Sequence, residues 1–348
     1  MTENRRIVLA ARPDGAPKET DFRLEEAPVP RPGDGELLLR TIYLSLDPYM
    51  RSRMNEAGAG YAPGVELGGV MPAGGVSEVV ESRAEGFAPG DMVNSFTGWQ
   101  SHSIARGAGA GTRRIDPANA PVSTAVGVLG MPGMTAYMGL LRIGQPKEGE
   151  TVVVSAASGA VGAVVGQIAR IKGCRVVGIA GAREKCEYVV DELGFDACVS
   201  HRDPDLPKVL GAACPDGIDV YFENVGGAVF QAVLPRLNPF ARVPVCGLIA
   251  QYNLKPGDPP SGPAAVTDLM RASLTRRLLI RGFIVYDFAE EADAFHTEMG
   301  EWVRGGRVRY REDVVDGIEN APRAFMGLLE GRNFGKLLVR VAPDPTLP

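Results

Sequence analysis

The stretch best suited to chemistry is residues 151–169, where glycines follow a run of apolar residues. It reads TVVVSAASGAVGAVVGQIA, which is the pattern of a strand, a tight turn and a helix. Backbone N–H groups at the start of a helix have no partner within the helix, and the helix dipole is positive there. Such a turn therefore binds phosphate well, and we expect it to hold a dinucleotide.

The turn is a variant of the usual dinucleotide-binding pattern, G-x-G-x-x-G. Its three positions are Ala157, Gly159 and Gly162, so alanine replaces the first glycine. We expect Gly159 to let the backbone approach the pyrophosphate, and Gly162 to let the helix pack close to its strand. Gly166, one turn later, is a second candidate for close packing. The alternative is that all these small residues serve a tight helix–sheet contact.

The end of the next strand indicates which dinucleotide is bound. An NAD site usually places Asp or Glu about 20 residues past the glycines, where it binds the ribose 2′-OH. This chain has Gly181 and Ala182 there, followed by Arg183, Glu184 and Lys185. A cation attracts a 2′-phosphate, whereas a carboxylate repels it, so NADP(H) is favoured over NAD. The alternative is that the two cations are solvated charges at an exposed helix start.

The elements that position this turn follow an alternating pattern from about residue 130. Helical segments separate apolar runs that have the character of strands buried on both faces. This alternation predicts right-handed βαβ units and a doubly wound parallel sheet, the Rossmann fold, over residues 130–305. Gly173 and Gly194 are expected to end its first two helices. The predicted strands are TVVVSA, CRVVGIA, ACVS, IDVYFENVG, ARVPVCG and LLIRGFIV.

Residues 1–129 have a different composition, rich in Gly and Pro. Short strand-like runs recur between turn signals such as RPGDGE and FAPGD, which favours an irregular antiparallel β-barrel. The last segment, 306–348, returns to this pattern and is expected to rejoin the first domain. The strand-like runs of the first segment are RIVLA, ELLLRTIYLSL, GVSEVVESR and DMVNSF.

Composition excludes several classes of protein. A length of 348 residues favours two domains, and 45% apolar with 23% charged residues is ordinary for a globular chain. The net charge of −5 gives no sign of nucleic-acid binding. The charge-free stretches 117–141 and 151–169 contain prolines or glycines that do not suit a membrane span. The N-terminus has too short an apolar run for a signal peptide, so we expect a cytoplasmic location.

Cysteine and histidine usage argues against a metal centre. None of the cysteines forms a CxxC pair, and none precedes Cys174, so reduced thiols are expected. The three histidines, His102, His201 and His296, are far apart in sequence, whereas a catalytic zinc typically needs three protein ligands. We therefore expect no metal. The five cysteines are Cys174, Cys186, Cys198, Cys214 and Cys246.

The chain also resembles a known family along essentially its whole length. Its motifs are similar, in order, to those of the zinc-independent medium-chain dehydrogenase/reductases, in the branch of alkenal double-bond, prostaglandin and curcumin reductases. Zinc-dependent relatives carry a GHE motif where this chain has Gly64, Val65 and Glu66. The segments that carry the resemblance are GMPGMTAY, SAASGAVGAVVGQIA, GIAGAREKC, YFENVGG, GLIAQYN, GFIVYDF and NFGKLLV.

The resemblance implies a GroES-like catalytic domain from both ends of the chain and a Rossmann domain between them, with NADPH in the cleft. It also implies a homodimer joined through the edge of the Rossmann sheet. The run LLIRGFIV, residues 278–285, is a candidate for that edge strand, although it could equally be covered within the monomer.

Cofactor contacts carry over onto matching positions. Lys185 resembles the lysine of the family that binds the 2′-phosphate, and Asn224 an adenosine-side contact. The family often has a tyrosine near the adenosine phosphates where this chain has His201, followed by Arg202; a solvated surface histidine is the alternative. The resemblance implies cofactor contacts at Met131, Gly133, Thr135, Ala157, Ser158, Gly159, Ala160, Val161, Gly162, Gly181, Lys185, His201, Asn224, Cys246, Gly247, Leu248, Ile249, Tyr252, Phe283, Ile284, Val285, Asn333 and Gly335.

The implied reaction is hydride transfer from NADPH to the β-carbon of an α,β-unsaturated aldehyde or ketone. Charge then develops on the substrate's carbonyl oxygen, so hydrogen-bond donors aimed at it would stabilise the transition state. Three tyrosines, Tyr252, Tyr49 and Tyr61, are the candidate catalytic residues, and each could instead be a packing residue. Two other functions stay open: an NADPH quinone reductase of the same superfamily, and an NADPH-binding protein without turnover.

Overall fold

The computed structural model describes residues 3–107, 111–255 and 266–347. The chain forms two compact units, one of Met1–Gly130 with Glu312–Pro348 and one of Met131–Arg311. The second unit ends after Arg311, beyond the residue 305 expected from the sequence. The Gln167 side chain explains this, because it donates to the carbonyl of Arg309 at 2.8 Å and accepts from its N–H at 2.7 Å.

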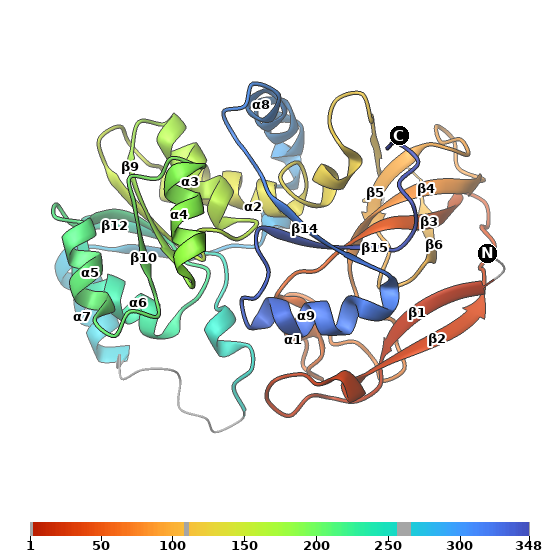
Figure 1. Cartoon of the computed structure of the whole chain (residues 1–348), viewed down its shortest axis with the longest axis horizontal. Coiled ribbons are helices and arrows are strands. Elements are labelled where there is room, and N and C mark those ends of the chain that lie inside the picture. The colour runs from red at the N-terminus through yellow and green to blue at the C-terminus, as the bar shows by residue number, and fades with distance from the viewer. Residues whose placement is uncertain (1–2, 108–110, 256–265, 348) are drawn as a thin grey trace. The chain divides into compact units, whose positions relative to one another are not determined.

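The first unit is built on a seven-stranded sheet that both ends of the chain complete (Figure 1). The strands of the whole unit are β1 Glu3–Leu9, β2 Phe22–Pro28, β3 Glu36–Ser45, β4 Gly74–Ser82, β5 Met92–Phe96, β6 His102–Arg106, β7 Arg113–Ile115, β14 Glu312–Asp316 and β15 Lys336–Arg340. Its helices are α1 Met50–Arg53 and α9 Ala321–Leu329. The sheet order is β14-β15-β3-β4-β5-β7, with β6 on β3, while β1 and β2 form a separate antiparallel pair.

Aromatic packing closes this unit. The Phe22 and Trp99 rings stack with centroids 5.7 Å apart, and the Phe325 ring of α9 meets Trp99 edge-on at 5.6 Å. Phe22 comes from β2 and Phe325 from near the C-terminus, so the core joins the two chain ends. Offset and edge-on contacts of this kind add to the stability gained from burial alone.

The second unit is a six-stranded, all-parallel sheet in the order β10-β9-β8-β11-β12-β13. When the six strands are numbered by their order in the chain, their order across the sheet is 3-2-1-4-5-6, which is the doubly wound Rossmann order. The predicted fold class is therefore confirmed. The strands are β8 Thr151–Ser155, β9 Arg175–Ala180, β10 Ala197–Ser200, β11 Ile218–Phe222, β12 Leu237–Val245 and β13 Leu279–Gly282, and the helices are α2 Met131–Met138, α3 Gly162–Ile171, α4 Arg183–Asp191, α5 Leu206–Ala213, α6 Gly227–Val233, α7 Val266–Arg276 and α8 Ala292–Arg304.

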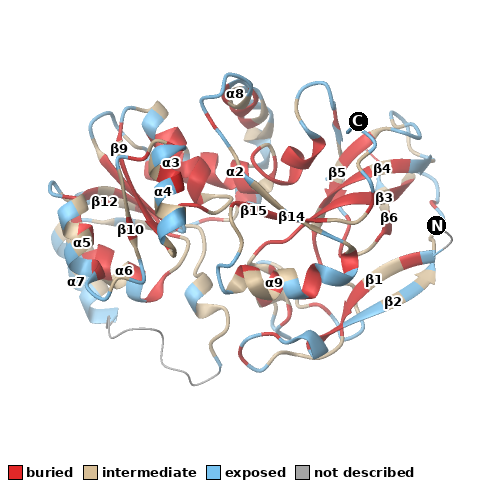
Figure 2. Cartoon of the chain, in the orientation of Figure 1, coloured by how far each residue is buried: buried red, intermediate tan, exposed pale blue. Residues whose placement is uncertain are grey.

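Helices cover both faces of this sheet, which is why its central strands are buried (Figure 2). Side chains of α5, α6 and α7 pack with strand residues into one apolar cluster. On the other face α2 contacts both α3 and α8. Reversal of the crossover direction after β10 produces this division, since each right-handed connection places its helix on the side set by the direction of travel.

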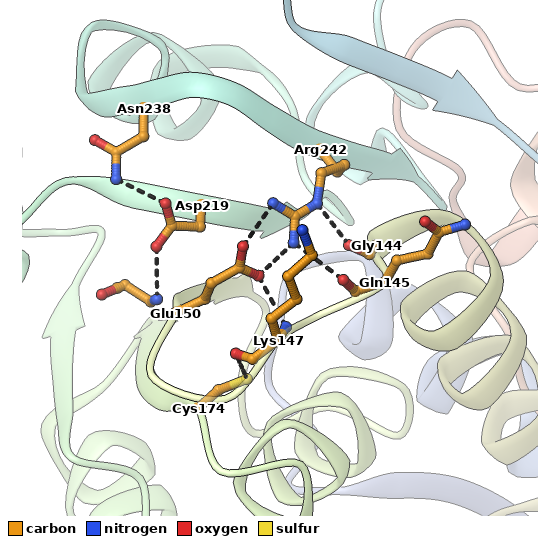
Figure 3. Close-up of polar contacts among 9 residues, drawn as sticks. Gly144, Gln145, Lys147, Glu150, Cys174, Asp219, Asn238 and Arg242 are labelled. Carbon is orange, nitrogen blue, oxygen red and sulfur yellow. Dashed lines mark hydrogen bonds and ion pairs between the residues drawn. The ribbon is translucent and has the colours of Figure 1, made fainter.

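The amino ends of the strands carry a polar cluster that fixes the approach to β8 (Figure 3). Arg242 of β12 donates from Nε to the Gly144 carbonyl at 2.9 Å and from Nη1 to Glu150 Oε1 at 3.0 Å. It also donates to the Gln145 carbonyl at 3.1 Å. Gln145 follows a short π-helical segment and has a φ of 44°, so Arg242 stabilises a left-handed turn about 100 residues earlier in the chain.

None of the helices in the described parts of the chain combines the length and the apolar character needed to cross a bilayer.

Candidate functional site

The glycine turn lies between Ser155, the last residue of β8, and Gly162, the first of α3. Ala156 has a φ of 51°, and the Gly159 N–H donates to its carbonyl at 2.9 Å, which closes the turn. A Cβ on Gly162 would lie 2.4 Å from the Ala156 carbonyl oxygen, so only glycine fits. A Cβ on Gly159 would lie 3.1 Å from the same Ala156 oxygen, and no other described atom outside its chain neighbours would be within 4 Å of it. Gly162 thus serves the turn, while Gly159 faces open space.

The alanine in the first motif position has a structural counterpart on the neighbouring strand. Ala157 is fully buried, and its methyl group lies 2.9 Å from where a Cβ on Gly178 of β9 would be. A side chain at Gly178 would therefore collide with Ala157. Because its side chain points inward, Ala157 can contact a cofactor only through its backbone.

Gly166 serves packing only. A Cβ there would lie 1.9 Å from Cζ of Phe195, which follows α4 in the chain. The ring of Phe195 therefore sits directly on the α3 backbone. Gly173, two residues past the end of α3, has a φ of 79° and ends the helix as predicted.

Basic side chains converge on Gly181, at the carboxyl end of β9. A Cβ on Gly181 would lie 3.0 Å from Nε2 of His201 and 3.7 Å from an Nη of Arg202. Partial burial of the His201 imidazole, followed by the charges of Arg202 and Lys185, lowers its pKa below the ordinary value, although the residue as a whole is exposed. Three basic groups are thus close enough to influence one another where an NADP 2′-phosphate is expected.

Arg183 and Lys185 differ in their surroundings. The Arg183 side chain is 90% exposed and donates to Glu187 Oε1 at 2.7 Å, one turn along α4. Lys185 is half-buried beside His201. The alternative of a solvated surface charge therefore applies to Arg183, whereas Lys185 stays the predicted 2′-phosphate ligand.

A buried carboxylate that the sequence analysis did not single out organises the turn after β11. Glu223 is 1% exposed, and its Oε1 accepts from the backbone N–H groups of Val225 at 2.7 Å and Gly226 at 2.9 Å. It also accepts from the hydroxyls of Tyr221 at 2.9 Å and Ser155 at 3.1 Å. Burial raises the pKa of Glu223 despite these donors.

Asn224 joins this turn to the glycine turn. Its backbone N–H donates to the Ser155 hydroxyl, and its side-chain amide donates to the Ser155 carbonyl, both at 2.8 Å. Ser155 therefore connects Asn224, Glu223 and the end of β8. Glutamate within the ENVGG motif, directly after an apolar strand, was the available sequence signal for Glu223.

The loop after β12 is attached to the same carboxylate residue. The N–H groups of Cys246 and Gly247 donate to the Glu223 carbonyl at 2.9 and 3.1 Å. The Tyr252 hydroxyl lies over this loop and accepts from the Leu248 N–H at 3.4 Å. Burial raises the pKa of Tyr252 above its ordinary value, so the phenol is protonated at neutral pH. The segment Cys246–Tyr252, including Ile249, thus forms one structured loop in the Rossmann unit.

Of the predicted contacts just after β13, Phe283 and Val285 turn their side chains inward, whereas Ile284 is partly exposed. Phe283 and Val285 are both 8% exposed, and the Phe283 ring packs on Phe222 with centroids 6.3 Å apart. The Ile284 N–H donates to Asp287 Oδ2 at 3.1 Å. The side chains of Phe283 and Val285 therefore serve packing.

On α2, Gly133 and Thr135 are buried, and the Thr135 hydroxyl donates to the Met131 carbonyl at 2.8 Å.

The first unit holds the other predicted residues. Tyr49 immediately precedes α1 and packs against the apolar core, while Tyr61 is 52% exposed. The Asn333 side chain donates to the Gly335 carbonyl at 2.8 Å, and Gly335 has a φ of 86°. Tyr49 and Tyr61 thus belong to this unit, and Tyr252 belongs to the Rossmann unit.

A buried ion pair fixes the loop that carries Tyr49. Lys336 is 4% exposed, and its Nζ donates to Asp47 Oδ1 at 2.9 Å and to the Leu46 carbonyl at 2.8 Å. The Ser45 hydroxyl donates to the second oxygen of Asp47. A buried charge is stable only when it is paired and hydrogen-bonded, as here. Lys336 lies in the NFGKLLV motif and Asp47 directly follows the run ELLLRTIYLSL, but their pairing depends on β15 and β3 being neighbours.

Within the described residues, no group of three or more His, Cys, Asp and Glu side chains is placed to hold a metal ion. His102 lies buried in β6 and contacts Ser101, while His296 of α8 lies against the Phe295 ring. Val65 is buried at the position where zinc-dependent relatives have a ligand histidine.

Comparison with known proteins agrees with this geometry. Residues 5–112 match the family described as the N-terminal domain of oxidoreductase, and residues 160–299 match the family described as zinc-binding dehydrogenase. The chain is 54% identical to the NADPH-dependent curcumin reductase of Escherichia coli (strain K12), over 98% of each chain. It is 40% identical to the NADP(+)-dependent 2-alkenal reductase of Nicotiana tabacum, over 98% of each, and 41% identical to prostaglandin reductase 1 of Mus musculus, over 98% of this chain and 100% of that protein.

A solved structure is similar over the same length. The crystal structure of CurA from Vibrio vulnificus in complex with NADPH has a TM-score of 0.92 and 49% sequence identity, and the match covers 98% of this chain and 100% of that one. The chain therefore belongs to the zinc-independent medium-chain dehydrogenase/reductases, in the branch that contains the curcumin, 2-alkenal and prostaglandin reductases.

Proposed function

We propose that this protein is an NADPH-dependent reductase of the carbon–carbon double bond of α,β-unsaturated aldehydes and ketones. The observation that carries the proposal is the convergence of His201 and Arg202 on Gly181, beside Lys185, in a chain 54% identical to an NADPH-dependent curcumin reductase. The arrangement suits a 2′-phosphate, and the name of the similar protein gives NADPH as the cofactor and curcumin as the compound reduced.

The cofactor site fits NADPH on the chemistry of its own residues. Gly159 leaves open space at the start of α3, where the N–H groups of the first helical turn suit a pyrophosphate. Lys185, His201 and Arg202 supply donors for a 2′-phosphate. Asn224 and the Cys246–Tyr252 loop, both fixed through Glu223 and Ser155, would border the rest of the dinucleotide. When bound, NADPH supplies the hydride.

Stabilisation of the developing charge is the main task left to side chains. As the β-carbon is reduced, the substrate's carbonyl oxygen becomes an enolate oxygen, and a nearby O–H donor lowers the barrier. Tyr252 suits this role because its oxygen already accepts from Leu248, which polarises the O–H toward donation. Its raised pKa keeps that proton in place. Tyr49 and Tyr61 are the candidates from the first unit for binding substrate or delivering the proton to the α-carbon.

The substrate's carbonyl itself takes up the negative charge, so the proposed reaction requires no metal. The protein must align the β-carbon with the hydride donor and keep water away from the enolate. The soft side chains of Met50 and Met54 are fully buried core residues, so they support the Tyr49 loop from within.

A direct assay separates this function from the two alternatives. The purified protein is mixed with NADPH and, in separate reactions, an alkenal, an enone and a quinone, while NADPH absorbance is followed and the products are weighed by mass spectrometry. We expect alkenal and enone products that have gained two hydrogens. Consumption of the quinone alone would replace the proposal with a quinone reductase. A thermal shift with NADPH but no turnover on any substrate would indicate a cofactor-binding protein.

We further propose a cytoplasmic homodimer joined at β13. This strand is the last in the Rossmann sheet, and Leu279 at its start is 49% exposed. An edge strand of this kind can pair with its copy in a second chain. Light scattering on the eluted protein should give twice the chain mass, and Leu279→Lys should shift it toward one chain mass. Recovery of the protein from a membrane fraction of its cells would contradict the location.

A further inference from the structure

Two of the five cysteines are neighbours in space. Sγ of Cys186, in the first half of α4, lies 2.7 Å from Sγ of Cys198 in β10. Both side chains are partly exposed, whereas Cys174 and Cys214 are buried. The sequence predicts reduced thiols with no pairing, since Cys186 and Cys198 are 12 residues apart and meet only when α4 packs against β10.

The two sulfurs differ in reactivity. The hydrogen bond from Cys198 lowers the pKa of the Cys186 thiol, while that same bond and burial raise the pKa of Cys198. The thiolate is the nucleophilic form of cysteine, so Cys186 is the more reactive of the two. A reactive, accessible thiol beside a second thiol is the usual arrangement of a cysteine pair that forms a reversible disulfide.

The pair is also close to the groups expected to hold the cofactor. Cys186 follows Lys185 directly on α4. Sγ of Cys198 lies 3.3 Å from where a Cβ on Gly178 would be, and that same position is 2.9 Å from the methyl group of Ala157 in the glycine turn. Cys186 is thus next in sequence to the predicted 2′-phosphate ligand, and Cys198 borders the same Gly178 site as Ala157 of the glycine turn.

We propose that Cys186 and Cys198 form a reversible disulfide under peroxide, and that this bond weakens the binding of NADPH. The effect on NADPH rests on the proposed role of Lys185 in holding the 2′-phosphate. Bond formation shortens the Sγ–Sγ distance from 2.7 Å to about 2.05 Å, and because Cys186 directly follows Lys185, we infer that the first turn of α4 adjusts and displaces the Lys185 side chain. Charge-assisted hydrogen bonds are short and directional, so this displacement weakens the contact with phosphate.

The chemistry is balanced with a peroxide as the oxidant. The Cys186 thiolate attacks one peroxide oxygen, the O–O bond breaks, and Cys186 becomes a sulfenic acid while hydroxide leaves and is protonated to water. The Cys198 sulfur then attacks the sulfenic sulfur, the S–O bond breaks, and a second water leaves. Two thiols lose two electrons in total, and hydrogen peroxide gains them. A dithiol reductant reverses the reaction by thiol–disulfide exchange.

The disulfide is tested on the purified full-length protein, treated with hydrogen peroxide and digested without reduction. Mass spectrometry should find the Cys186 peptide linked to the Cys198 peptide in the wild type and in Cys214→Ser, and no such link in Cys198→Ser. If both peptides stay unlinked in the wild type while peroxide is consumed, the proposal is wrong.

Its consequence is measured as the affinity for NADPH and NADH before and after oxidation. Loss of one charge-assisted contact corresponds to roughly tenfold weaker NADPH binding. We expect a loss of about this size in the oxidised wild type, recovery with dithiothreitol, unchanged NADH affinity, and no response in Cys198→Ser. An intact disulfide with unchanged NADPH affinity would overturn the link to the cofactor.

These readouts are independent of substrate turnover. If the protein fails to reduce any enone, the proposed function falls, yet the linked peptides and the NADPH affinity still decide the present proposal. If Lys185→Ala weakens NADPH and NADH equally, the 2′-phosphate role of Lys185 is wrong and the proposed effect on NADPH falls with it. Peptide mapping then still decides whether the disulfide forms.

Discussion

Replacement of Lys185 by alanine tests how this chain selects its cofactor. The basic group at Gly181 contains three side chains, of which Lys185 is half-buried and lies on the first turn of α4. Only NADPH carries the 2′-phosphate that these groups are expected to bind. The substitution should therefore weaken NADPH and leave NADH unchanged.

The size of the effect follows from the number of donors that remain. A hydrogen bond to a charged group contributes about 1.5–3 kcal/mol, and His201 and Arg202 continue to face the phosphate, so the lower figure applies. About 1.5 kcal/mol corresponds to a loss of roughly tenfold in affinity. Removing Arg202 as well should weaken NADPH further. The total loss in the double variant should be smaller than the sum of the losses in the two single variants, because neighbouring charges act together.

The chain provides a matched control two residues away. Arg183 has the same charge and lies on the same helix turn, but its side chain is 90% exposed and paired with Glu187. NADPH and NADH are each titrated into Lys185→Ala and Arg183→Ala in a calorimeter. Only the affinity of Lys185→Ala for NADPH should fall. Equal losses for NADPH and NADH, or equal effects of the two substitutions, would refute the assignment of the 2′-phosphate to this group.

Three further outcomes are expected. The His201 pKa lies below its ordinary value in the free protein, and a bound phosphate would raise it, so NADPH binding takes up a proton. NADPH affinity should therefore increase as the pH falls from about 8 toward about 6. His201→Gln should flatten this dependence in calorimetric titrations, whereas an unchanged slope would remove His201 from the site. Tyr252→Phe should lower kcat on the order of 100-fold with little change in NADPH affinity; weaker NADPH binding with unchanged kcat would make Tyr252 a cofactor contact only. Gly166→Ala forces a methyl group onto Phe195 and should lower the free energy of unfolding by about 1–3 kcal/mol, seen as a lower Tm. Gly159→Ala should instead keep the wild-type Tm and bind NADPH more weakly. The reverse pattern would contradict the assignment of Gly166 to packing and Gly159 to binding.

The parts of the fold that could be predicted were those with strong local patterns. Apolar runs identified every strand of the Rossmann sheet, and strands buried on both faces produce such runs because they have no polar side. In the first unit the runs RIVLA, ELLLRTIYLSL, GVSEVVESR and DMVNSF correspond to β1, β3, β4 and β5, whereas no run predicts β2, β6 or β7. β7 spans only Arg113–Ile115, and β2 exposes Arg23 and Glu26, so neither carries an apolar run. β2 pairs with β1 and β7 with β5, both nearby in the chain, whereas β6 pairs with β3, about 60 residues earlier.

The predicted site residues that lie in loops were recoverable only through motif order. Their geometry depends on contacts between distant segments, as Glu223 illustrates. In the sequence it is a carboxylate after a strand, which is ordinary at a sheet edge. In the structure it receives the N–H groups of its own turn and the hydroxyl of Ser155, from a strand about 70 residues earlier, as buried polar groups must. A buried carboxylate with an elevated pKa gives no sign of itself in local composition.

The variant glycine motif shows why a departure from a pattern has to be assessed together with its neighbours in space. Alanine at position 157 appeared to weaken the case for a dinucleotide turn, because the first glycine normally permits the tight turn beside the next strand. The extra methyl group is accommodated by Gly178 on β9, where any side chain would collide with it. The space that one glycine would have provided within the turn is provided by another glycine on the adjacent strand. Gly178→Ala should therefore be more damaging in this chain than in a variant that also carries Ala157→Gly, since the double substitution returns the space to its usual side of the contact.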